Sequence, residues 1–152
     1  MMITERQIDD IIDHLERQDD KEIIEEISQS QPALLSYVLS EGFEMLTKDE
    51  NKIMIFLFLV IYSAFGSELE PIEPSDIEST EDKNWEIFNE TSGTEFQDKI
   101  TPFFKDYTQE DLLAFVEDAL VDDEDSFVTK EGKELLFIGL KTTIDTLCEI
   151  AV

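Results

Sequence analysis

Apolar residues recur at helical spacing along most of the chain. The first set shares one helical face at positions i, i+3, i+4 and i+7: Ile8, Ile11, Ile12 and Leu15. Thr4, with Gln7 three residues later, has the pattern of a capping box at the start of this helix. Signals for strands are weak, because no Asn-Gly or Asp-Gly turn occurs and no alternation is sustained. The pattern therefore predicts an all-α protein.

Further helices are predicted from their expected starts. The residues expected to cap or begin a helix are Asp19 or Asp20, Pro32, Asp49, Thr108 and Thr129. The helix that begins at Pro32 is expected to run to about Leu46, and Pro102 is expected to bend or end a later helix. A chain of 152 residues has the length of one ordinary domain. We expect residues 1–152 to form a single domain of six to eight helices.

The most apolar stretch of the chain is Ile53 to Phe65 (IMIFLFLVIYSAF). A membrane span needs about 20 apolar residues, so this shorter run is typical of a buried core helix. Because it is hydrophobic on nearly every side, we expect it to be buried all round, with the other helices wrapped about it.

Two segments suggest an internal duplication. Residues 31–38 read QPALLSYV and residues 109–116 read QEDLLAFV, and Thr47-Lys48 then matches Thr129-Lys130. The pattern favours a duplicated helical hairpin, as in helical-repeat proteins, and chance likeness between amphipathic helices is the alternative. The helix after Thr129 carries Lys133 and Lys141, so it is expected to be amphipathic and peripheral.

Residues 67–83 (SELEPIEPSDIESTEDK) differ in composition from the rest of the chain. They contain seven acidic residues, one lysine, Pro71 and Pro74, which predicts an acidic loop within the domain. Trp85, the single tryptophan, follows this segment and is expected to anchor it on the core. A short helix is expected around Trp85.

Charge narrows the classes of partner. The chain has 11 Lys and Arg against 38 Asp and Glu, a net charge of −27. Direct nucleic-acid binding is therefore not expected, because it requires a basic surface, and anionic membrane surfaces are excluded for the same reason. Four explanations of the acidity are open: solvation of the surface, adaptation to high salt, recognition of a basic protein, and mimicry of DNA phosphates.

Residues that carry chemistry are scarce. His14 is the single histidine and Cys148 the single cysteine, so zinc and di-iron sites built on several such ligands are not expected. His14 and Asp10 share a helix face with no nucleophile beside them, which favours a solvated pair. We expect no catalytic residue, cofactor or metal. A lone thiol and an N-terminus without signal-peptide pattern favour the cytoplasm.

These observations predict a non-enzymatic, acidic interaction module, an adaptor or inhibitor of a basic protein. A DNA-mimic inhibitor and a helical protein that binds a small ligand or lipid are the alternatives, and the oligomeric state is left open. Binding residues concentrate in loops. The expected partner contacts are therefore Glu68, Glu70, Glu73, Asp76, Asp122, Asp123, Glu124 and Asp125.

Overall fold

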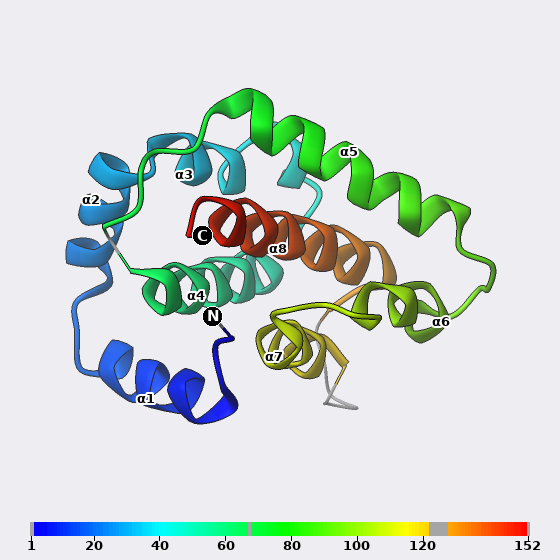
Figure 1. Cartoon of the computed structure of the whole chain (residues 1–152), viewed down its shortest axis with the longest axis horizontal. Coiled ribbons are helices and arrows are strands. Elements are labelled where there is room, and N and C mark those ends of the chain that lie inside the picture. The colour runs from blue at the N-terminus through cyan, green and yellow to red at the C-terminus, as the bar shows by residue number, and fades with distance from the viewer. Residues whose placement is uncertain (1, 67, 122–127, 152) are drawn as a thin grey trace.

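The computed structural model describes residues 2–66, 68–121 and 128–151. Within these ranges the chain is all-helical, with eight α-helices, two short 3₁₀ helices and no strand, in one domain (Figure 1). The first half contains α1 (Glu5–Glu16), α2 (Asp20–Ser30), α3 (Pro32–Val38), η1 (Glu41–Phe43) and α4 (Lys48–Phe65). The second half contains α5 (Pro74–Glu90), α6 (Phe96–Ile100), η2 (Thr101–Phe104), α7 (Glu110–Val121) and α8 (Lys130–Ile150). The predicted fold class is confirmed.

Two long helices, α4 and α8, form the centre of the domain. They lie side by side and run in the same direction, with α5 across one side of α8 and α7 and α6 near its N-terminal half (Figure 1). Helix α1 packs on α4 and on α7, and α2 leads into α3. The prediction that the helix after Thr129 is peripheral is wrong, because α4, α5, α6 and α7 all contact it.

Helix α8 is buried in spite of its polar residues because those residues have partners. Residues 136–144 are buried without interruption, and Lys141, Thr142 and Thr143 lie among them. The Thr143 hydroxyl donates to the Gly139 carbonyl at 2.9 Å, one helical turn earlier. A buried polar group that is hydrogen-bonded does not incur the cost of an unpaired one. Side-chain composition alone therefore misplaced this helix.

The caps predicted for α1, α2 and α8 are confirmed, and the cap predicted for α4 is wrong. Thr4 and Gln7 form the predicted capping box, and Asp19 and Thr129 cap α2 and α8. The cap of α4 is Thr47 rather than Asp49, because Thr47 pairs with Glu50 in a second capping box.

The helix that begins at Pro32 is shorter than predicted. It ends at Val38, and η1 then turns the chain so that Phe43 enters the core with 5% of its surface exposed. Phe43 approaches the backbone of α8 closely, since a Cβ added at Gly139 would lie 2.8 Å from the Phe43 ring. The missing side chain of Gly139 therefore lets η1 reach α8.

The acidic segment is not wholly a loop. Residues 68–73 lie outside helices, but Pro74 occupies the first turn of α5, which continues to Glu90. Proline is tolerated there because the first helical N–H groups have no partner within the helix. Ile77, Asn84 and Phe88 form the buried face of α5, so the predicted loop at 74–83 and the short helix at Trp85 belong to one helix.

Candidate functional site

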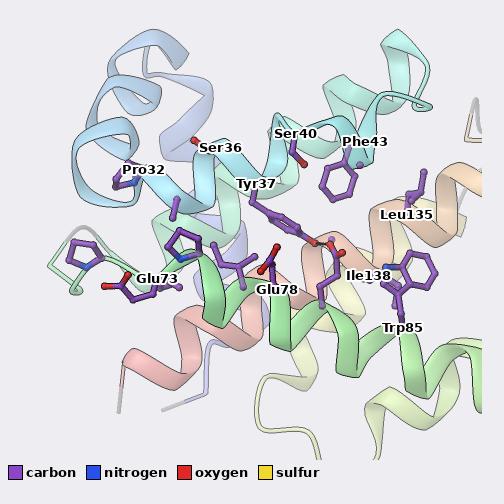
Figure 2. A pocket seen from close by; sticks show the side chains of 18 residues that line it. Pro32, Ser36, Tyr37, Ser40, Phe43, Glu73, Glu78, Trp85, Leu135 and Ile138 are labelled. Atoms are coloured by element: carbon purple, nitrogen blue, oxygen red, sulfur yellow. Dashed lines mark hydrogen bonds between the residues drawn. The ribbon is translucent and has the colours of Figure 1, made fainter.

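A large hollow of the domain is a groove between α3 and α5. One wall comes from α3 and η1, the other from residues 71–73 and the N-terminal two-thirds of α5, and α8 forms the floor. Figure 2 shows side chains from these elements converging on one space. The volume of this space is about 970 Å³. We call it the α3–α5 groove.

The floor and much of the walls are apolar. Ile72 and Ile77 close the groove from the α5 side, and Ile138 and Gly139 form the floor on α8. Trp85 is half-buried on α5 and meets Phe88 edge to face, with ring centroids 5.7 Å apart. Such a surface loses water favourably when an apolar group covers it.

Tyr37 crosses the groove from α3 toward α5. Its hydroxyl donates to the Glu81 carboxylate, and its ring meets Phe43 edge to face at 5.2 Å. Burial, followed by the bond to Glu81 and the negative charge of Glu81, raises the pKa of Tyr37 well above its ordinary value. Tyr37 thus stays protonated and fixes Glu81 in the groove wall.

Tyr37 also separates the groove into two compartments. Figure 2 shows Phe43, Leu135 and Trp85 on one side of it, and Pro32 and Glu73 on the other. One compartment is therefore lined mainly by aromatic and aliphatic side chains, and the other by proline rings and a carboxylate.

The charge of the groove has one sign. Three carboxylates line it, those of Glu73, Glu78 and Glu81, and its lining contains no Lys or Arg. Glu73 and Glu78 are exposed. Across the described part of the chain the ion pairs amount to one, Lys141 with Asp145, so neither of these glutamates is neutralised by a lysine or arginine. The groove is an apolar surface bordered by uncompensated negative charge.

The structure places the predicted contact residues in different surroundings. Glu68, Glu70, Glu73 and Asp76 are all exposed, but of these four Glu73 alone lines the groove. The main chain of this segment is held by Gln31, whose side chain donates to the Glu70 carbonyl and accepts from the Ile72 N–H. Asp122, Asp123, Glu124 and Asp125 lie outside the described residues.

The sequence analysis missed Tyr37, Phe43, Glu78 and Glu81 as residues of one site. Pro74, Glu78, Glu81 and Trp85 stand at i, i+4, i+7 and i+11, which is the spacing of one helix face. That signal was present, but it has meaning only when residues 74–85 are read as helix.

A second polar cluster lies between α5, α8 and the segment before α7. Lys141 Nζ donates to Asp145 Oδ2 at 2.7 Å and to Asn84 Oδ1 at 3.3 Å, and it lies 4.6 Å from the centroid of the Tyr107 ring. Burial, then the charge of Asp145, raises the pKa of Tyr107, which donates to that carboxylate. The effect of this cluster is to fix α5 and Tyr107 on α8.

The other candidate residues form no site within the described ranges. His14 is exposed, in agreement with a solvated face, and Cys148 is half-buried. Residues 2–66, 68–121 and 128–151 contain no group of three or more His, Cys, Asp or Glu side chains able to hold a metal ion. Nor does any helix in these ranges combine the length and hydropathy needed to span a membrane.

Comparison with known proteins identifies no relative. The chain matches no protein-family model, no curated protein and no solved structure. Its functional interpretation therefore depends on the geometry of the α3–α5 groove.

Proposed function

We propose that the chain is a non-catalytic protein-interaction module that binds a basic partner in the α3–α5 groove. The observation that carries this proposal is the lining of the groove, which combines an apolar floor with three carboxylates and no cation. Opposite charges across an interface raise the association rate and discriminate against partners of the wrong charge. An adaptor and an inhibitor of the partner both fit this role.

The shape of the groove supports the same function. Binding energy at interfaces concentrates in a few aromatic or aliphatic anchors that fill well-packed pockets. Phe43, Trp85 and Leu135 border such a pocket, and carboxylates lie at its edge. The net charge of −27 extends the attraction to a positive partner well beyond the groove at low salt.

A small-molecule site is the second candidate. The volume of about 970 Å³ falls at the upper end of the usual range for ligand pockets, roughly 300–1,000 Å³. A ligand for this site would be cationic and largely apolar. A protein partner is favoured because the groove is open to solvent along two exposed glutamates, Glu73 and Glu78.

Site-specific photocrosslinking in the native host tests the proposed function. A photoreactive phenylalanine analogue is placed at Ser36, which is exposed and lines the groove, and in a matched variant at Gln29, which is exposed on α2. We expect a discrete protein adduct at Ser36 and none at Gln29, and we expect the adducted protein to be basic. Equal adducts at both positions, or none at Ser36, would contradict the proposed function.

A further inference from the structure

We infer that the occupant of the α3–α5 groove is a basic amphipathic α-helix of about three turns; this inference rests on the proposed function and specifies the partner chemistry. The length follows from the groove itself. Its α5 wall extends from Pro74 to Trp85, which at 1.5 Å per residue is about 16 Å, or roughly eleven residues of a docked helix.

The secondary structure of the walls selects the binding mode. A peptide that binds as a strand needs an exposed sheet edge, and the described part of the chain contains no strand. The groove is bounded by helices on both sides and floored by a third, so its surface consists of side chains. A helix that lays its apolar face into a hydrophobic groove binds without main-chain hydrogen bonds to its receptor.

The two compartments indicate where the apolar and the cationic side chains of the docked helix lie. An apolar anchor fits the compartment bounded by Phe43, Trp85 and Leu135, because that side of Tyr37 is aromatic and aliphatic. Lysine or arginine side chains then extend toward Glu73 and Glu78, which no cation neutralises. Arginine suits these positions best, since its guanidinium pairs with a carboxylate through two hydrogen bonds.

Tyr37 and Glu81 shape the site between the compartments. The bond from Tyr37 to Glu81 holds this carboxylate on the groove wall without a cation. The Glu81 carboxylate is therefore available to a positive side chain of the docked partner helix. The expected order along the partner is an apolar anchor near Trp85, then cations near Glu78 and Glu73.

Trp85 provides a direct optical readout of this groove, because it is the single tryptophan of the chain. The probe is a blocked peptide of leucine and lysine that is amphipathic at helical spacing. Comparison peptides are a scramble of the same composition, a leucine–glutamate version, and a proline-rich peptide of equal positive charge. We expect the amphipathic basic peptide to shift the Trp85 emission to shorter wavelength and to bind at least about tenfold more tightly than each comparison peptide.

A matched pair of charge variants separates groove binding from general attraction to an acidic protein. Glu73→Gln/Glu78→Gln removes two groove carboxylates whose side chains contact no cation, and Glu86→Gln/Glu90→Gln removes two exposed carboxylates of α5 outside the groove. We expect the first variant to bind the peptide about fivefold or more weakly and to show a flatter dependence of affinity on salt. We expect the second variant to change the affinity for the peptide less than about twofold. Circular dichroism verifies that both variants stay helical.

Three outcomes overturn the inference. If both charge variants lose affinity equally, the peptide recognises net charge and not the groove. If the proline-rich or scrambled peptide binds as tightly as the amphipathic one, the occupant is not a helix. A discrete adduct at Ser36 together with failure of the basic helix would leave the proposed function standing and refute this inference alone, so the two failures are distinguishable.

Discussion

Helices α4 and α8 start side by side and run in parallel, but they bury different kinds of side chain. In α4 the longest buried run is apolar or aromatic, from Leu57 to Tyr62, and yet Phe56 beside it is 41% exposed. In α8 the buried run from Leu136 to Ile144 includes a lysine and two threonines. The helix with the more polar sequence is therefore the more fully enclosed one.

This difference shows that burial follows from the number of neighbouring elements rather than from mean hydropathy. Helices α4, α5, α6 and α7 pack on α8, whereas the main neighbours of α4 are α8 and α1, and Phe56 on α4 is left 41% exposed. A polar residue can lie in such a centre when a partner is supplied at the right place. For Lys141 the partners are Asp145 on its own helix and Asn84 on α5.

The two helices also share one carboxylate at their N-termini. Glu50 Oε1 accepts from the Thr47 N–H at 2.9 Å, and Glu50 Oε2 accepts from the Thr129 N–H at 2.7 Å and from the Thr129 hydroxyl. Gly132 makes this possible, because a Cβ at that position would lie 1.9 Å from Glu50 Oε2. One side chain thus caps α4 and fixes the start of α8 beside it.

Among substitutions that test this difference between α4 and α8, removal of Lys141 is expected to lower stability the most. Lys141→Ala leaves Asp145 without its cation and opens space beside Tyr107, which should lower the free energy of unfolding by about 3 kcal/mol. Urea denaturation followed by circular dichroism measures this loss. Lys141→Met/Asp145→Asn keeps an acceptor for Tyr107 and removes both charges, so it should recover at least half of the loss. If Lys141→Ala is neutral, the polar residues of α8 do not contribute to its position.

Gly132→Ala tests whether the shared cap requires glycine. The new methyl group displaces the Glu50 carboxylate from Thr129, and the lost cap interactions should cost about 2 kcal/mol even though alanine favours helices more than glycine does. Chemical denaturation of Gly132→Ala, Glu50→Ala and the double variant measures the coupling. We expect strong non-additivity, with the alanine at 132 harmless once Glu50 is shortened. Additive losses would contradict a shared cap.

The change of stability at acid pH should also reveal the contribution of the Glu50 charge. Burial opposes its charge, but the hydrogen bonds from Thr47 and Thr129 together prevail and lower the pKa of Glu50. A lowered pKa in the folded state means that the stabilisation is complete above the unfolded value, about 4.3, and is lost as the pH falls through the folded value.

The difference in unfolding free energy between the native chain and Glu50→Gln isolates this effect from repulsion among the other carboxylates. That difference should be constant near neutral pH and should shrink as the pH falls through the folded-state pKa of Glu50. A difference that stays unchanged down to acid pH would show that the Glu50 charge makes no contribution.

Substitution of Phe56 has the smallest expected effect. Phe56→Gln replaces an exposed aromatic side chain on α4 and should change the free energy of unfolding by no more than about 0.5 kcal/mol. Phe58→Ala, at a fully buried position two residues later, serves as the destabilising control. A loss for Phe56→Gln close to that of Phe58→Ala would mean that this face of α4 is covered in solution.

Much of the fold was predictable because its signals are local. Capping patterns at Thr4, Asp19 and Thr129, Pro32 at a helix start and Gly66 after α4 are each determined by a few neighbouring residues. Helix α5 was missed because its acidic residues, together with Pro74 at its start and Pro71 before it, resemble a loop. Its buried face includes Asn84, whose partners Thr142 and Asp145 lie about 60 positions further along the chain.

The groove was not predictable, since its residues come from segments that sequence patterns do not connect. Glu73 was identified through its charge, but Tyr37 and Phe43 were assigned no role beyond lying in the helix predicted from Pro32 to about Leu46. Leu135 and Ile138 line the floor because α8 is central, and the sequence pattern indicated the opposite. The packing of α3, α5 and α8 determines which acidic residues border an apolar hollow. The internal duplication and the site at Asp122–Asp125 stay predictions.

The central place of α8 has a consequence for the order of assembly during translation. Every helix that contacts α8 precedes it in the chain, and the bonds from Thr129 to Glu50 join positions 79 residues apart. Until α8 emerges from the ribosome, α4 presents side chains such as Met54, which packs beside Gly139 of α8, with no cover on that side. Such a nascent chain is exposed to aggregation and to chaperones. Completion of the core, and with it the floor of the groove, is therefore a late step governed by long-range contacts.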